Sequence, residues 1–287
     1  MQSAPSSETV IAPGVPAPTT GRRLIKRHSL LVRITHWINV VAIFFLLMSG
    51  LQIFNATPQL YLGHKSDFAH PAVSLGAENT ANGPVGITSI FGARFDTTGF
   101  LGLSTANGRL SVRGFPSWAT LPSYQDLATG RRWHFFFAWV FAINGAIYLI
   151  ASIIDRHLWR DLVPGRADLR AIGRTIVDHA RLRFEHVREY NVLQKLTYLI
   201  MVVVVLPLIV LAGMAMSPGL DSAFPWLVDL FGGRQTARTV HFICAMTILA
   251  FVFVHVVMVL LSGVWNNLRS MITGRYAVDA EGAPHAE

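Results

Sequence analysis

The stretch that decides the fold is VHFICAMTILAFVFVHVVMVLL, residues 240–261. It contains no Asp, Glu, Lys or Arg, and it reaches the roughly 20 residues that an α-helix needs to cross the hydrocarbon core of a bilayer. The apolar run around it covers about 239–265, and three further runs lie at about 34–54, 133–154 and 192–216. Apolar residues make up 52% of the chain and charged residues 14%. Four such runs exceed what a soluble core of this size can bury, so the sequence predicts an all-α membrane protein with a four-transmembrane-helix bundle.

Lysine and arginine are unevenly distributed among the segments that connect the predicted spans. Five precede the first span, eight arginines lie in 155–190, and two follow the fourth span, whereas the longer segment 55–132 carries six. Cytoplasmic loops of membrane proteins are enriched in these residues. We therefore expect both termini and 155–190 in the cytoplasm and 55–132 on the other side. The net charge of +8 then reflects membrane topology and not a nucleic-acid surface.

The segments outside the predicted spans differ in composition. Residues 1–24 are rich in Pro, Ser, Thr and Ala and lack the apolar core of a signal peptide, so they are expected to be a disordered cytoplasmic tail. Residues 276–287 are expected to be a second cytoplasmic tail. Between these tails, 25–275 forms the predicted membrane domain. Within it, 55–132 mixes Gly, Pro and Ser with many aromatic residues, which predicts an ordered cap with short hairpins. Such a cap can dock a partner or only shield the bundle, and the sequence leaves both open.

Four of the eleven histidines lie in the predicted spans. His36 opens the first span, His134 opens the second, and His241 and His255 share the fourth. Fourteen residues of helix separate the last two by roughly 21 Å and bring them about 40° short of whole turns, so both rings project from much the same face. With the topology above, His36 has the depth of His255 and His134 has the depth of His241.

Paired imidazoles at two depths are suited to haem, because haem iron accepts one axial nitrogen on each face of the macrocycle. A structural role in helix contacts is the alternative for a single membrane histidine. A proton relay would recruit Asp or Glu within the spans, and a zinc or copper site would need three or four ligands at one depth. The sequence has a single cysteine, Cys244, and no CxxCH motif for covalent haem. We predict two haem b groups whose irons are held by His36–His255 and His134–His241.

Several pieces of the sequence together resemble one family. They are RITHWINVVAIFFLLMSGL at 33–51, His134 at the start of the second span, EYNVLQK at 189–195, and the two histidines of the fourth span. They resemble the four-helix dihaem cytochrome b subunits of bacterial respiratory enzymes, a cytochrome b561-like group. It includes the cytochrome b of nickel–iron hydrogenases, the gamma subunit of formate dehydrogenase and the cytochrome b of thiosulfate reductase. The family pairs its histidines as the depths predict here.

The resemblance implies a function in the bacterial inner (plasma) membrane. It implies a subunit that anchors a periplasmic redox enzyme, molybdenum-containing or iron–sulfur, and exchanges electrons between that enzyme and menaquinone or ubiquinone. The family's quinone neighbourhood matches Asn191 and Gln194, which could equally be a helix cap and an interfacial side chain. The long cap favours a thiosulfate reductase-like partner. Such a subunit is not expected to be catalytic alone.

Three other functions remain open from the sequence. One is a stand-alone transmembrane quinol oxidoreductase, another is a hydrogenase or formate dehydrogenase cytochrome b subunit, and the third is a transporter or proton channel with structural histidines. Four arginines also lie at depths where haem carboxylates are expected, although positive helix flanks are the simpler explanation for them: Arg33, Arg131, Arg132 and Arg238.

Overall fold

Four helical segments form the body of the structure. The computed structural model describes residues 22–156, 163–165, 168, 170, 172, 173, 175, 177 and 192–279. Within these residues, the segments long and apolar enough to cross a membrane are α1 (Leu30–Phe54), α2 (Leu127–Ile154), Val192–Ala215 and α8 (Arg234–Leu261). No more than 22% of the most apolar window of each is buried, so most of these side chains keep some exposed surface, as contact with lipid requires. The predicted fold class, a bundle of four transmembrane helices, is confirmed.

The third span is not a uniform α-helix. It consists of α4 (Val192–Ile200), a π-helical turn η3 (Met201–Val205) and α5 (Leu206–Ala215). Pro207 lies in the first turn of α5 and has no backbone N–H to donate. The wider π turn directly before it accommodates the missing helical hydrogen bond without breaking the span.

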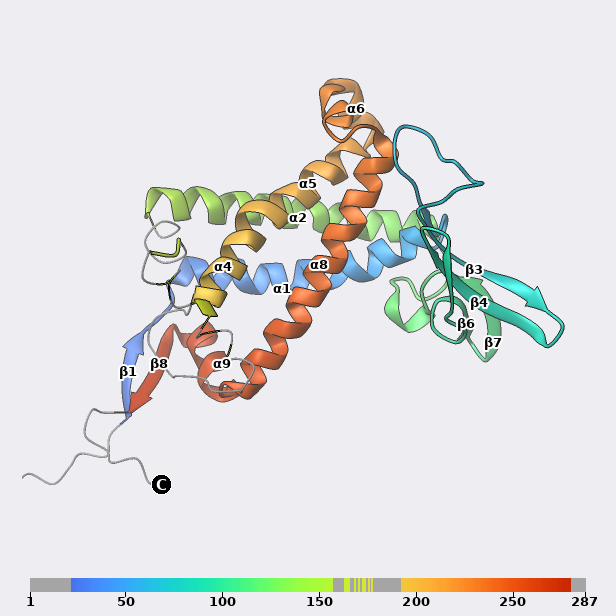
Figure 1. The fold of residues 1–287 in the computed structure, drawn as a ribbon. Helices are drawn as coiled ribbons and strands as arrows, with labels where there is room; N and C mark the ends of the chain where they lie inside the picture. Colours follow the sequence, from blue (N-terminus) through green and yellow to red (C-terminus); the bar gives the residue numbers. More distant parts are fainter. Residues whose placement is uncertain are drawn as a thin grey trace, which may run out of the picture.

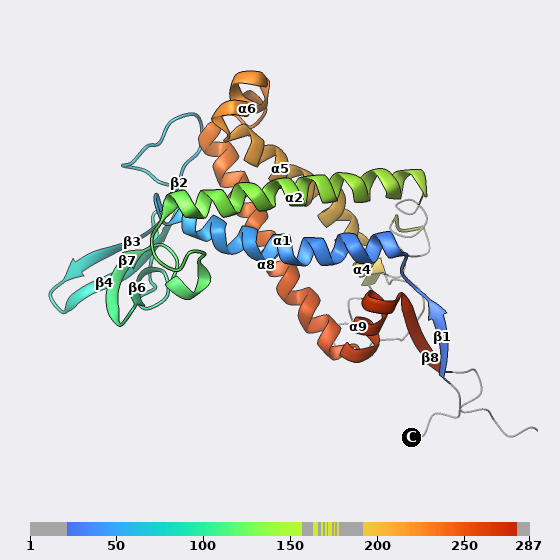
Figure 2. The same cartoon turned by 180° about the vertical axis from the view of Figure 1, so that it is seen from behind.

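The spans pack as two pairs that share one interior. Helix α1 packs along α2, and α5 packs against α8, as both ribbon views show (Figures 1 and 2). Buried Ala42, Phe137 and Phe141 fill the first interface, and buried Met201, Cys244 and Ile248 fill the second. Half-buried Ile43, Leu206 and Ile209 contact both clusters and join them.

The segment between α1 and α2 is a β-structured cap. Strands β2 (Gln59–Leu60), β3 (Val73–Thr80), β4 (Gly83–Ile90) and β5 (Ala93–Asp96) form one antiparallel sheet in that order, and β6 (Gly102–Ala106) pairs with β7 (Arg109–Arg113). A single 3₁₀ turn, η1 (Ser117–Ala119), follows. The buried guanidinium of Arg113 donates to the carbonyls of Phe115 (2.6 Å) and Ser123 (3.0 Å) and to Thr120 Oγ1 (2.9 Å). Burial lowers the pKa of Arg113. Its hydrogen bonds connect β7 to the segment 115–123, which leads to α2.

The cap is anchored on the first turns of α8, which follows two short helices, α6 (Pro218–Ala223) and α7 (Trp226–Leu230). The backbone N–H of Gly63 donates to Thr236 Oγ1 (2.7 Å), and Thr239 Oγ1 donates to the carbonyl of Tyr61 (2.6 Å). Gly233, at φ 122°, lies so close that a Cβ there would come within 2.4 Å of the Gly63 carbonyl oxygen. Because this contact requires glycine, the cap and α8 meet at a defined position.

The two ends of the described chain meet at the opposite end of the bundle. Strand β1 (Arg22–Lys26) pairs antiparallel with β8 (Arg275–Asp279), which follows the short helix α9 (Val264–Thr273) (Figure 1). Both strands extend ordered structure into the expected tails 1–24 and 276–287, because each provides the partner for the other's backbone groups. The end with the cap is called the cap end below, and the end with β1 and β8 is called the terminal end.

Candidate functional site

The four histidines of the spans lie in two facing pairs. At the cap end, the ring centres of His134 and His241 are 6.1 Å apart, with the ring planes inclined at 63°. At the terminal end, the ring centres of His36 and His255 are 6.4 Å apart, inclined at 60°. The structure therefore brings together the residues that the depths paired, one pair from α2 and α8 and the other from α1 and α8.

Both separations suit one metal atom between two imidazoles. A metal–imidazole bond is about 2 Å long and the ring centre lies roughly 1 Å behind the bonding nitrogen, so two rings on opposite sides of a metal have centres about 6 Å apart. Within the described residues, no group of three or more His, Cys, Asp or Glu side chains converges on one point. Two ligands per level suit a metal whose other ligands come from a macrocycle, as in haem.

The cap-end imidazoles are fixed by hydrogen bonds through Nδ1. His241 Nδ1 lies 2.9 Å from the carbonyl oxygen of Ile209 and donates to it. His134 Nδ1 lies 3.2 Å from Ser49 Oγ. The Ser49 hydroxyl already donates to the carbonyl of Phe45 at 2.6 Å, so it accepts from the ring. With the proton on Nδ1 in both rings, each Nε2 keeps the lone pair that a metal needs.

Two glycines let neighbouring helices approach these rings. A Cβ at Gly50 of α1 would lie 3.3 Å from His134 Cε1, and one at Gly213 of α5 would lie 3.2 Å from His241 Cε1. Each imidazole therefore rests against helix backbone. Since His134 and His241 belong to α2 and α8, all four spans shape the cap-end pair.

The terminal-end pair has a different environment. The His255 ring stacks on Phe251, with centres 5.8 Å apart and planes inclined at 17°, and His36 meets Trp37 edge-on at 5.4 Å. Trp37 Nε1 donates to the carbonyl of Met271 in α9 at 3.2 Å. His36 Nδ1 is buried and makes no hydrogen bond to the described part of the chain. Among the described residues, the His36 ring is therefore held by packing alone, and its buried Nδ1 can still take a hydrogen-bond partner or another ligand.

A cavity of ≈ 1390 Å³ surrounds the His36–His255 pair and is lined by parts of all four spans and α9. Pockets for drug-sized molecules measure about 300–1,000 Å³, so this cavity has room for a flat macrocycle and a second organic molecule. Its walls are mainly apolar. Polar groups enter it at the terminal end, among them Arg27, Gln194, Tyr198 and Asn267.

The two expected quinone residues have different outcomes. Gln194 lines this cavity, whereas Asn191 lies outside the described residues. Next to Gln194, Lys195 forms an ion pair with Asp168 at 2.8 Å, which ties the start of α4 to the segment before it. The ion pair with Asp168 and the interactions of Gln194 together fix the position of this helix end.

One polar cluster was missed in the sequence. Asn144 is buried in the middle of α2, and its amide donates to the carbonyl of Thr35 (2.9 Å) and to Asn39 Oδ1 (2.8 Å). Thr35 and Asn39 flank His36 on α1. An asparagine inside each of two apolar spans was the available signal, because buried amides in membranes pair across helices. The cluster fixes α1 to α2 at the level of His36.

Comparison with known proteins gives a family and one curated relative. A family model described as "Prokaryotic cytochrome b561" matches residues 27–274. The chain is also 32% identical, over 249 residues, to a protein of Azospira oryzae named "Putative protein-methionine-sulfoxide reductase subunit YedZ1". That alignment covers 86% of this chain and 96% of the relative.

Proposed function

Because the chain belongs to the prokaryotic cytochrome b561 family, we propose that it holds two haem b groups and carries electrons across the membrane between quinone and a periplasmic oxidoreductase. The two imidazole pairs, with ring centres 6.1 and 6.4 Å apart, carry this proposal. The haem of the cap end would be held by His134 and His241, and that of the terminal end by His36 and His255. Each haem would supply a one-electron iron couple, and the two histidines of its pair would hold it.

The protein residues have three tasks in this function. The histidines would hold the haem iron, and the bonds of the cap-end rings to Ser49 and Ile209 through Nδ1 leave Nε2 as the nitrogen available to it. The packed apolar side chains between the levels, such as Cys244 and Ile248, exclude water. Fourteen residues of α8 set the spacing of the two levels at roughly 21 Å along its axis.

We assign the cap to the periplasm and the terminal end to the cytoplasm. The distribution of Lys and Arg supports this orientation, since α2 ends and α4 begins at the terminal end and the sequence between them carries eight arginines. The quinone would then bind in the large cavity near His36, where Gln194 and Tyr198 provide polar groups on one face of α4, four residues apart. Asn191 stays a proposed member of this site.

The proposed partner is an oxidoreductase that meets the cap. The cap adjoins the start of α8, only a few residues from His241, so a redox enzyme docked there would be near the cap-end pair. The name of the Azospira relative favours an enzyme that reduces methionine sulfoxide over a thiosulfate reductase. A molybdenum-containing enzyme remains our proposal for its chemistry.

Haem content tests the proposal directly. The full chain, purified from haem-sufficient cells, should contain two haem b per chain by absorption of the pyridine complex. His241→Ala and His255→Ala should each lose one haem, and the two variants should lose different spectral components. His70→Ala is the matched control, because that ring lies in the cap beside Asp67 and is exposed. Zinc, copper or no metal in the wild-type chain, or two haems retained in His241→Ala, would refute the proposal.

A further inference from the structure

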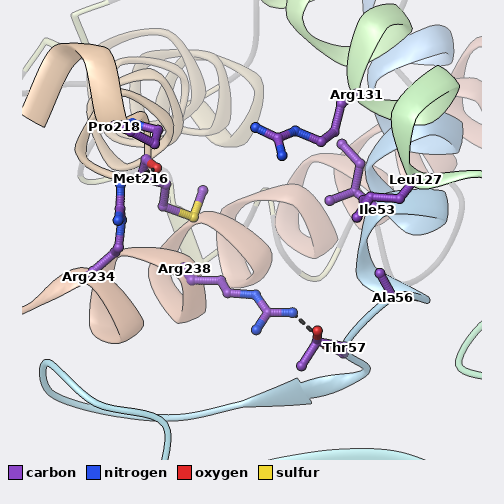
Figure 3. Close-up of a pocket in the computed structure, with 9 residues that line it drawn as sticks. All are labelled: Ile53, Ala56, Thr57, Leu127, Arg131, Met216, Pro218, Arg234 and Arg238. Atoms are coloured by element: carbon purple, nitrogen blue, oxygen red, sulfur yellow. Dashed lines mark hydrogen bonds between the residues drawn. The ribbon is translucent and has the colours of Figure 1, made fainter.

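A second feature of the cap end is a pocket that gathers three arginines. It measures ≈ 360 Å³ and lies between the cap-end tips of the spans, with Arg131 across the space from Arg234 and Arg238 (Figure 3). Ile53, Leu127 and Met216 contribute apolar walls. Three guanidinium groups around a partly apolar pocket are an arrangement suited to a carboxylate or another oxyanion.

The positive charges of this pocket are not compensated by the protein. No Asp or Glu lines it, and none of the three arginines forms an ion pair within the described residues. Arg234 donates to the carbonyl of Met216 (2.9 Å) and Arg238 to that of Thr57 (2.5 Å). Arg131 lies over the ring of Phe135, 5.4 Å from its centre. These contacts orient the guanidinium groups but bring no negative charge, so the pocket keeps a net positive charge that an anion can neutralise.

The register of the helices relates the pocket to the cap-end imidazoles. Residues three apart in a helix lie on one face, about 4.5 Å apart along the axis. The pocket residues Arg131 and Arg238 are each three positions toward the cap from His134 and His241.

The other two spans repeat this relation. Ile53 and Met216 line the pocket three positions toward the cap from Gly50 and Gly213, which touch the imidazole rings. Each span thus contributes one pocket residue that lies three positions toward the cap from a histidine or from a glycine in contact with one. The pocket therefore lies one helical turn beyond the His134–His241 pair. A flat ligand held between those rings would have its cap-side edge next to the pocket.

We propose that Arg131, Arg234 and Arg238 bind the two carboxylates of the haem held by His134 and His241. This inference rests on the proposed function, and it assigns the orientation of that haem, with its carboxylate edge toward the cap. The guanidinium groups act as positioning residues. They also favour the reduced iron, because the oxidised iron carries one more positive charge, which nearby cations repel.

The experiment compares midpoint potentials of the two haems in the purified full-length chain. Arg131→Gln, Arg234→Gln and Arg238→Gln should each lower the potential of the haem that His241→Ala removes, by about a tenfold change in the oxidised-to-reduced ratio, 59 mV for one electron. The potential of the other haem should not change. Arg132→Gln is the matched control, because it removes the same charge from the adjacent position, which does not line the pocket.

Further variants keep the result decisive. If a glutamine variant fails to accumulate, Arg131→Lys and Arg238→Lys retain the charge and should leave the potential closer to wild type than glutamine does. Unchanged cap-end potentials in all three glutamine variants, or an equal shift in Arg132→Gln, would overturn the inference. So would a wild-type potential that moves with added sulfate, since a soluble anion would then occupy the pocket. Each of these outcomes leaves two haems bound, whereas a chain without haem defeats the proposed function itself.

Discussion

Gly50 and Gly213 show how single residues shape the cap-end pair. An alanine at Gly50 would place its Cβ 3.3 Å from His134 Cε1, tighter than ordinary contact, and Ser49 fixes the other side of that ring. Gly50→Ala should therefore reduce haem retention at the cap end, with an overpacking cost of about 1–3 kcal/mol. The measurement is the haem-to-protein ratio after detergent washing and mild heating.

Gly219→Ala provides the control for that substitution. A Cβ at Gly219 in α6 meets nothing within 4 Å, and Gly219 lines neither pocket, so the variant has at most a gain in helix propensity, up to about 1 kcal/mol. It should retain both haems as the wild type does. Equal retention in Gly50→Ala and Gly219→Ala would mean that the close approach of α1 does not support the His134 ring.

The buried amide of Asn144 should affect only the terminal-end pair. Asn144→Ala leaves Asn39 and the Thr35 carbonyl without their buried partner, which costs about 1–3 kcal/mol. Because both partners flank His36, the potential of the terminal-end haem should shift while that of the cap end stays constant. Thr247→Ala is the control, since the Thr247 hydroxyl bonds only within α8, to the Ile243 carbonyl. A uniform effect on both potentials would contradict a local role.

The sequence predicts which segments form the spans, but it does not predict where two of these helices begin. Apolar runs predict the four spans, yet α2 begins six residues before the expected position 133 and α8 five before 239. Their first turns are polar and are fixed by contacts outside the run, at Asp126 for α2 and at the cap for α8. Hydropathy reports burial in lipid, and it does not report where backbone hydrogen bonds begin. Such starts matter here, because Arg131 and Arg238 lie in them.

The start of α2 gives a pH prediction. Asp126 caps this helix by accepting from the backbone N–H of Thr129 at 3.0 Å, and its pKa is lowered from 3.8 by the hydrogen bonds to Thr129. Because the pKa of the Asp126 carboxyl is lower in the folded chain than in the unfolded one, the stabilisation is complete at neutral pH. It is lost as the pH falls through the folded-state pKa. Asp126→Asn keeps a capping side chain that does not titrate. The variant should lose less thermal stability than the wild type when the pH is lowered from about 5 to about 3. An identical loss in both proteins would rule out this cap as an acid-sensitive element.

Helix α8 combines features of both ends of the protein. It carries one histidine of each pair, two of the three pocket arginines, and the contacts that anchor the cap. The histidines were evident in the sequence because their spacing is a local property of one helix. The three-arginine pocket was not, since it requires the packing of four spans. Arg234 gave no sequence signal at all, and Arg132, which the sequence grouped with Arg131, does not line the pocket.

The two-level arrangement predicts a separation of electron entry from electron exit. In proteoliposomes, a quinol should reduce the terminal-end haem of His241→Ala at a rate close to wild type, because the large cavity and the His36–His255 pair are unchanged. Transfer onward to an acceptor protein at the cap should fall at least tenfold, because that variant lacks the cap-end metal site. Stopped-flow absorption at the haem bands measures the first step, and oxidation of the quinol by the acceptor measures the whole path. His70→Ala, altered only in the exposed cap, should behave as wild type in the first step. If His241→Ala passed electrons to the acceptor at the wild-type rate, the path would not run through the cap-end pair, and the cap would not be the side on which electrons are exchanged with the partner.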